Sequence, residues 1–315
     1  MDGKVQHKKG VWIAIGAAAL LALLFIPGIG PKGESEAASD KPEVLTTFTV
    51  VADMVREVAG DRLEVNSITK PGAEIHGYEP TPGDLRRAAS ADLVIQNGMN
   101  LEKWFEQFID DARAPSVSLT EGVDPIPIAG QSEYAGKPNP HAWMSVQNAL
   151  IYVDNIQKAL TDLDPAGADY FAANAKRYKA QLAKIGVDAQ REVKKLPPNR
   201  RALVSCEGAF SYLARDYGLT EQYLWPVNAE AEGTPQQIAK SVDFVKDRDV
   251  KAVFCESTVS NKAQKQVAQE SGAAFGGTLY VDSLSKRGGP VPTYLDLLRR
   301  DTETIVNGLI GKDSQ

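Results

Sequence analysis

Two histidines and two acidic residues are the side chains of this chain that could together bind a metal ion. His76 stands in the segment GAEIHGYEP and His141 in NPHAW, and no other histidine follows the apolar N-terminal segment. Glu207 stands in SCEG and Asp282 in YVDS. Two neutral imidazoles and two carboxylates cancel the charge of one divalent ion and suit a borderline-hard metal. These residue types indicate a divalent cation as the ligand, provided that the fold brings them together.

All four residues lie in segments that follow predicted β-strands. In parallel α/β sheets, ligands bind in the crevice at the carboxyl ends of the strands, so these segments are expected to meet. Taken alone, each histidine could simply form hydrogen bonds within its loop, and each acid could cap the next helix. The combination favours a metal site because both histidines fall in the same half of the chain. The strands concerned are residues 63–68, 117–119, 202–204 and 278–281.

The two halves of the chain repeat one order of strands and helices. In the first half we expect strands at 45–50, 63–68, 93–95 and 117–119, with helices at 52–59, from Thr81, around Trp104 and Phe108, and at 146–163. In the second half we expect strands at 202–204, 223–225, 250–255 and 278–281, with helices at 210–217, from Thr234, from Lys262 and at 294–309. This alternation predicts an α/β fold with two similar (β/α)4 lobes and parallel four-stranded sheets.

A long amphipathic helix is predicted between the two halves, over residues 165–196. Apolar residues recur there at steps of three and four, Pro165 suits the first turn, and Pro197 ends the helix. At 1.5 Å per residue it would be about 48 Å long. The predicted divisions are therefore an N-terminal lobe at 41–163, the linking helix at 164–198 and a C-terminal lobe at 199–315.

Residues 1–40 have the pattern of an export segment followed by a linker. Three lysines precede the apolar run 11–26, and small residues follow it at 35–38. The run is shorter than the about 20 residues of a membrane span, but an extension to Ile29 would approach that length, so an uncleaved anchor stays open. No cysteine stands directly after the run, in residues 27–40, so lipid attachment there is not expected. The mature chain is expected to work in the periplasm or otherwise outside the cytoplasm.

The charge balance favours a cation over an anion as partner. The chain has 35 basic and 41 acidic residues, a formal net charge of −6, and no basic run of the kind that binds nucleic acid. The segment GIGPKG at 28–33 fits a dinucleotide-binding glycine pattern, but it follows the export segment and has proline where a helix should open. We interpret it as linker.

Several short motifs resemble those of a known family. Across about residues 41–311, the chain is similar to the metal receptors of bacterial ABC importers, in their manganese and zinc branch. The resemblance implies two (β/α)4 lobes bridged by one helix, one metal ion between them, an ABC permease in the membrane as partner, and no enzymatic activity; we expect a monomer. It implies His76, His141, Glu207 and Asp282 as ligands. The motifs are HGYEPTP (76–82), NPHAWM (139–144), EGAF (207–210), EGTP (232–235) and DSL (282–284).

The ligand set favours Mn²⁺ but leaves Zn²⁺ open. Zinc members usually have a third histidine where this chain has Glu207, and often a histidine-rich loop, and neither is present here. Oxygen ligands suit Mn²⁺, yet the Irving–Williams order gives Zn²⁺ at least equal affinity. A zinc-selective receptor is therefore the main alternative. A mononuclear metalloenzyme is a further one, because two histidines and a carboxylate also form the facial triad of iron oxygenases, although four protein ligands nearly fill the coordination shell.

The two cysteines of the chain, Cys206 and Cys255, are positioned to meet. If the second sheet has the strand order 2-1-3-4, both lie at the carboxyl ends of neighbouring strands, and they could be bridged. An exported chain permits a disulfide, while two buried thiols are the alternative. The pair resembles that of cyanobacterial manganese-binding members of the family.

Overall fold

The computed structural model describes residues 41–105, 115–129, 134–227 and 233–311. All of them belong to one compact unit, Ser39–Gln315. The predicted export segment 1–40, Phe108 of one predicted helix and Glu232 of the EGTP motif lie outside the described residues. Within the described ranges, no helix combines the length and the apolar character that a membrane span requires.

The first lobe is a parallel four-stranded sheet with the order β2-β1-β3-β4. This is the doubly wound arrangement, in which the strand order reverses beside β1. Buried apolar residues cover both of its faces, in a large core that includes α1 and a smaller one beneath α2. Its elements are β1 (Glu43–Thr46), α1 (Thr49–Ala59), β2 (Glu64–Ser67), α2 (Pro82–Ser90), β3 (Leu93–Gln96), β4 (Ser116–Ser118), the 3₁₀ turn η1 (Ala142–Met144) and α4 (Val146–Leu163).

The second lobe repeats the strand–helix alternation, with one difference in its sheet. The hydrogen-bonded ladders form two parallel pairs, β5–β6 and β7–β8, instead of one continuous four-stranded sheet among the described residues. Cys206 on β5 and Cys255 on β7 have Cα atoms 4.9 Å apart, the spacing of neighbouring strands. The strands therefore still follow the order 2-1-3-4. The elements are β5 (Ala202–Glu207), α6 (Ser211–Tyr217), β6 (Thr220–Trp225), α7 (Pro235–Asp247), β7 (Ala252–Glu256), α8 (Lys262–Ser271), β8 (Ala274–Leu279) and α9 (Tyr294–Leu309).

Several predicted strand boundaries were wrong. The strand β5 extends three residues past its predicted end, to Glu207, and β6 begins three residues before its predicted start, at Thr220. Two further errors have a clear structural cause. The strand predicted at 45–50 ends at Thr46, and α1 begins at Thr49 because its valines and Met54 pack into the core at helical spacing. The strand predicted at 278–281 begins at Ala274 and ends at Leu279. The first half of β8 was not predicted because it contains Gly276, and glycine is a weak strand former. A Cβ at Gly276 would lie 2.5 Å from the Phe254 ring, so close packing requires glycine there.

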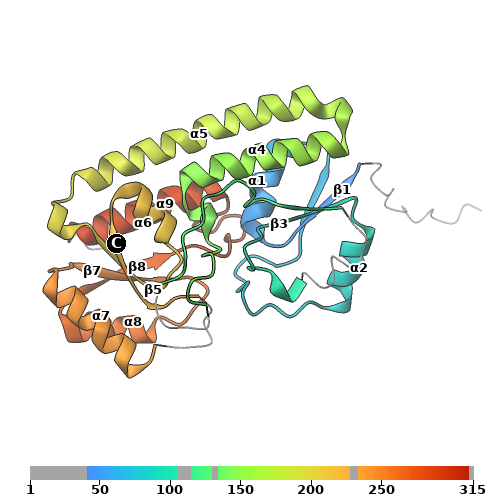
Figure 1. The fold of residues 1–315 in the computed structure, drawn as a ribbon. Helices are drawn as coiled ribbons and strands as arrows, with labels where there is room; N and C mark the ends of the chain where they lie inside the picture. Colours follow the sequence, from blue (N-terminus) through green and yellow to red (C-terminus); the bar gives the residue numbers. More distant parts are fainter. Residues whose placement is uncertain (1–40, 106–114, 130–133, 228–232, 312–315) are drawn as a thin grey trace, which may run out of the picture. The chain divides into compact units, whose positions relative to one another are not determined.

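The long helix is confirmed as α5 (Ala168–Lys194), which follows a 3₁₀ turn, η2 (Pro165–Gly167). The α-helix thus starts three residues later than predicted and is about 40 Å long. It packs against α1 in the first lobe and α9 in the second, with α4 alongside it (Figure 1). Its predicted apolar stripe is buried: Phe171, Ala175, Tyr178, Leu182, Ile185, Ala189 and Val193, followed by Leu196.

Candidate metal centre

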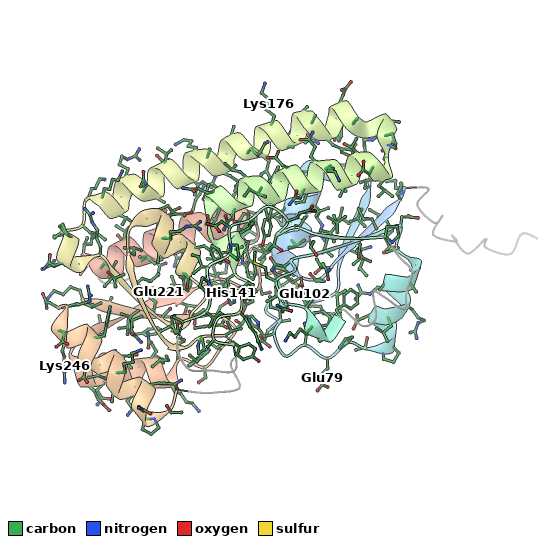
Figure 2. The ribbon with its side chains drawn as sticks, in the orientation of Figure 1. Glu79, Glu102, His141, Lys176, Glu221 and Lys246 are labelled. Atoms are coloured by element: carbon green, nitrogen blue, oxygen red, sulfur yellow. A yellow bond between two sulfur atoms is a disulfide. The ribbon has the colours of Figure 1, made fainter. Side chains whose placement is uncertain are left out.

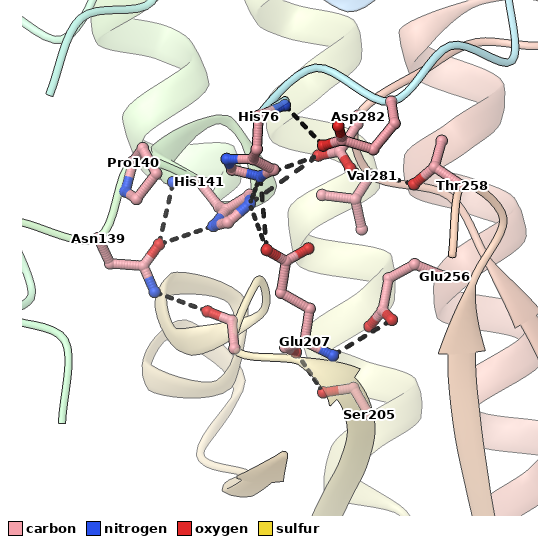
Figure 3. Close-up of polar contacts among 12 residues, drawn as sticks. His76, Asn139, Pro140, His141, Ser205, Glu207, Glu256, Thr258, Val281 and Asp282 are labelled. Atoms are coloured by element: carbon pink, nitrogen blue, oxygen red, sulfur yellow. Dashed lines mark hydrogen bonds and ion pairs between the residues drawn. The ribbon is translucent and has the colours of Figure 1, made fainter. Parts of the chain in front are cut away.

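The structure brings all four predicted ligand residues together. His76 lies in the loop between β2 and α2, and His141 directly precedes η1. Glu207 is the last residue of β5, and Asp282 lies three residues beyond β8. One ligand atom from each residue lies within 4.8 Å of the other three. Figure 3 shows the four side chains converging, the histidines from one lobe and the acids from the other.

The distances between these atoms suit a single ion. Nε2 of His76 lies 3.1 Å from Nε2 of His141 and 3.4 Å from Glu207 Oε1. Asp282 Oδ1 lies 4.0 Å from His76 Nε2 and 3.9 Å from His141 Nε2, and Glu207 Oε1 lies 3.9 Å from His141 Nε2. Ligand atoms about 2.1 Å from one tetrahedral ion are about 3.4 Å apart. The observed separations bracket that value.

Asn139 determines which nitrogen of His141 faces the other three residues. The backbone N–H of His141 donates to Asn139 Oδ1 over 3.0 Å, and Asn139 Nδ2 donates to the Gly208 carbonyl over 2.6 Å. These bonds fix the orientation of the amide, because a backbone N–H only donates and a carbonyl oxygen only accepts. His141 Nδ1, 2.9 Å from the same Oδ1, must therefore carry the proton. Nε2 is left with its lone pair directed into the site.

Burial affects the charge of both His141 and Asp282 in ways that suit a bound cation. Burial, followed by the nearby His76, places the pKa of His141 well below its ordinary value, so the imidazole is neutral. Burial raises the pKa of Asp282, an effect that His76 opposes. Asp282 Oδ2 accepts a hydrogen bond from Thr258 Oγ1 over 3.1 Å, whereas the fully buried Oδ1 has no hydrogen-bond partner in the described part of the chain. A cation beside Oδ1 would offset the cost of burying that oxygen.

Glu207 is held by contacts on its backbone. Its N–H donates to Glu256 Oε2 over 3.2 Å, and its carbonyl accepts from Ser205 Oγ over 2.8 Å. Burial raises the pKa of Glu256 well above its ordinary value. The loop of His76 is held separately, by the Trp104 indole N–H, which donates to the Ile75 carbonyl over 2.8 Å. The segments that carry Glu207 and His76 are thus both anchored by hydrogen bonds.

His76 lies on the side of the site nearest to solvent. Its side chain is 6% exposed, against 0% for His141 and Asp282 and 1% for Glu207. A cavity of about 70 Å³ adjoins it, lined among others by Met99 and Pro140. An ion could therefore reach the site past His76 more easily than past the other three residues.

The predicted disulfide between Cys206 and Cys255 is confirmed. It lies one residue before Glu207 on β5 and one residue before Glu256 on β7. Because both sulfurs are in the bond, the cluster of Cys206, Cys255 and Glu256 offers no thiolate for a second metal ion.

Comparison with known proteins decides the family. The family model described as "Zinc-uptake complex component A periplasmic" matches residues 44–308. The chain belongs to this family. Zinc-uptake component A proteins are substrate-binding proteins of metal ABC transporters, so the predicted resemblance is confirmed.

Relatives within the family carry the names of different metals. The chain is 47% identical to the "Iron-binding protein YfeA" of Yersinia pestis, over 92% of this chain and 93% of that protein. It is 34% identical to the "Manganese ABC transporter substrate-binding lipoprotein PsaA" of Streptococcus pneumoniae, over 94% and 98%. Membership of the zinc-uptake component A family therefore leaves the metal open.

Solved structures of a periplasmic metal-binding protein from Candidatus Liberibacter asiaticus support the two-lobed fold. For its S38A mutant, the Mn-bound form has a TM-score of 0.81 at 38% identity, and the metal-free form 0.80 at 37%. Each comparison covers 85% of this chain and 100% of that chain. The fold is thus equally similar to a metal-bound and a metal-free form.

Sequence reasoning missed the residues that contact the four proposed ligand residues. Asn139 is the first residue of the NPHAWM motif, and its position two residues before His141 was the available signal. Glu256 and Thr258 had no such signal, because their contacts with Glu207 and Asp282 join segments that are distant in sequence.

Proposed function

We propose that this chain binds one divalent transition-metal ion outside the cytoplasm and delivers it to an ABC permease. The proposed ligands are His76, His141, Glu207 and Asp282. The observation that carries the proposal is the Asp282 carboxylate. Its buried Oδ1 has no hydrogen-bond partner among the residues described and lies within 4.0 Å of both imidazole Nε2 atoms. Such an arrangement is costly without a cation and favourable with one.

We propose Mn²⁺ as the ion that the chain delivers. Two carboxylates in the set suit Mn²⁺ better than a set with three histidines would. One relative is named for manganese, and one of the Liberibacter structures is Mn-bound, although another is Cd-bound. Zinc remains the second candidate, because the family model is named for zinc uptake and Zn²⁺ stands above Mn²⁺ in the Irving–Williams order.

The test is a titration of the purified chain with Mn²⁺ and with Zn²⁺. Parent protein should bind one equivalent, and Asp282→Asn should bind far more weakly because it removes the buried charge. Asp296→Asn is the matched control, since Asp296 lies partly exposed on α9. Equal binding by the parent and D282N would contradict the proposed site. Metal content after expression at controlled Mn/Zn ratios then reports which ion is loaded.

The remaining parts of the proposal follow from the sequence. Residues 1–40 would direct export or anchor the chain, residues 41–163 and 199–315 would form the two lobes, and residues 164–198 would join them; we expect the chain to act as a monomer. A receptor role predicts no turnover, and an assay with Fe²⁺ and O₂ distinguishes it from a facial-triad oxygenase. Uncoupled O₂ consumption that requires His76 would favour the enzyme.

A further inference from the structure

A chain of hydrogen bonds runs from His141 into the second lobe. His141 Nδ1–H donates to Asn139 Oδ1, and Asn139 Nδ2 lies 3.3 Å from Ser211 Oγ. Ser211, the first residue of α6, donates its hydroxyl proton to Glu221 Oε2 on β6 over 2.6 Å. Every donor points the same way, from the imidazole toward the glutamate. The chain therefore ends on a carboxylate in the opposite lobe.

Glu221 is largely buried but borders a solvent-accessible cleft, so its carboxyl group can change charge near neutral pH. Its Oε1 is buried and has no hydrogen-bond partner among the residues that the structure describes. Burial raises the pKa of Glu221 to about 7, and the hydrogen bond from Ser211 opposes that rise. The residue lines a cleft of about 870 Å³, together with Arg215 of α6, Tyr223 of β6 and Lys240 of α7. Solvent in this cleft gives the carboxyl group a route for proton exchange.

The two bonds that Asn139 makes to the second lobe have different roles. Its bond to the Gly208 carbonyl is short, at 2.6 Å, and by itself fixes the orientation of the amide. Ser211 is not needed for that orientation. What Ser211 and Glu221 add is a negative charge at the end of a polarised donor chain. Aligned hydrogen bonds strengthen one another, and a carboxylate behind a histidine makes that histidine a better metal ligand.

We propose that Ser211 and Glu221 are positioning residues of the metal centre, through which the ionised Glu221 increases the basicity of His141. This inference rests on the proposed function. In the familiar arrangement a carboxylate contacts the metal-bound histidine directly. Here Asn139 of the first lobe and Ser211 of the second lie between the carboxylate and the histidine. Metal binding and ionisation of Glu221 are then linked, each favouring the other.

The experiment compares the Mn²⁺ affinity of variants at pH 6, 7 and 8, by competition with a chelator. Glu221→Gln keeps the shape and an acceptor oxygen but removes the charge. E221Q should weaken Mn²⁺ binding about tenfold at pH 8. Loss of a residue that hydrogen-bonds to a metal ligand usually costs about 10- to 100-fold in affinity, and we expect the lower value because Glu221 acts through two intervening residues. At pH 6 the parent carboxyl is itself mostly protonated, so the ratio of the two affinities should approach one. Ser211→Ala should resemble E221Q, while Ser211→Thr, which keeps the hydroxyl, should resemble the parent.

The control for charge is Glu303→Gln, an exposed glutamate on α9 in the same lobe. It should leave the affinity unchanged at every pH. Parent and E221Q profiles that run parallel from pH 6 to 8, or an equal loss in E303Q, would overturn the role of Glu221. If E221Q fails to fold, the S211A and S211T pair decides the question in the same way. Failure of the parent itself to bind Mn²⁺ would instead overturn the proposed function.

Discussion

Asn139 is the residue on which the geometry of His141 most directly depends. It accepts from both the backbone N–H and the Nδ1–H of His141 and donates to Gly208, next to Glu207. Asn139→Ala should therefore reduce Mn²⁺ affinity by about 10- to 100-fold, as is usual for residues that orient a metal ligand. Chelator competition measures the loss. Asn155→Ala is a suitable control, because Asn155 donates to the Leu119 and Glu121 carbonyls and touches none of the four proposed ligands. An unchanged affinity in N139A would show that the imidazole needs no such support.

Protons should compete with the metal at this site. The imidazoles bind metal only when neutral and the carboxylates only when ionised. The low pKa of the buried His141 keeps it neutral as the pH falls, whereas the raised pKa of Asp282 makes that carboxylate take up a proton at a higher pH than an exposed aspartate. Mn²⁺ affinity should thus be high at neutral pH and fall by about tenfold per pH unit for each proton taken up on release. Dialysis followed by metal analysis, with circular dichroism to exclude unfolding, measures this. Retention of Mn²⁺ at about pH 4 would argue against these ligands.

At the residue scale, the sequence predicted the four side chains that meet but not what holds them. Residue type and position after a strand indicated that His76, His141, Glu207 and Asp282 could meet, because the carboxyl ends of parallel strands lie at the same edge of each sheet. The family resemblance then implied these four as the ligands. The contact from Glu256 to Glu207 depends on β5 lying beside β7. Such a contact between segments that are distant in sequence depends on how the strands pack, so no local sequence pattern could predict it.

At the scale of elements, the disulfide compensates for a gap in the second sheet. The bond joins β5 to β7, which share no hydrogen-bonded ladder among the described residues. Both cysteines directly precede a glutamate of the site region, Glu207 and Glu256, and these two are linked by the backbone hydrogen bond of Glu207. The covalent link therefore fixes the strand end that carries one proposed ligand.

Loss of this bond should weaken both folding and metal binding. The double variant Cys206→Ser, Cys255→Ser releases a loop with a sequence separation of 49 residues. The chain-entropy model gives a loss of about 4 kcal/mol in the free energy of unfolding. Urea unfolding and Mn²⁺ titration measure the two effects, and the serine variant avoids reductants that bind metal. Equal Mn²⁺ affinity in the parent and the double variant would show that Glu207 keeps its position without the bond.

Two helix starts were predicted correctly, unlike several strand boundaries. Thr81 and Thr234 each begin a helix with a complete capping box, as their Thr-Pro sequences indicate. Capping is local, so a few residues contain the whole signal. The extent of β8 depends instead on Phe254, which packs where a side chain at Gly276 would be. A strand whose glycine is required by a distant ring cannot be recognised from its own residues.

At the scale of the molecule, many side chains bridge the two lobes beneath α5. The Trp143 indole donates to the Val281 carbonyl over 3.1 Å, and the Gly72 N–H donates to Ser283 Oγ over 2.7 Å. The Tyr294 N–H donates to Asp53 Oδ2 over 2.8 Å. Figure 2 shows side chains filling the region around His141 between the lobes. These bonds join segments on both sides of the proposed metal site, and opening the lobes would break them together.

The lobes should therefore move little when the metal leaves. A wide hinge motion would have to bend the continuous helix α5 and expose buried donors such as the indole of Trp143, which costs about 1–3 kcal/mol for each group left unsatisfied. Release of one ion supplies no new contacts to offset that cost, so we expect the change to be confined to loops such as that of His76, the proposed ligand nearest to solvent. The near-equal similarity of this chain to a metal-free and a Mn-bound relative agrees with this expectation. Small-angle X-ray scattering of the chain with Mn²⁺ and after chelation should give the same radius of gyration, and crystal structures of both forms should superpose as whole molecules. A domain opening in the metal-free form would show that α5 bends, and that the bonds between the lobes are weaker than their burial indicates.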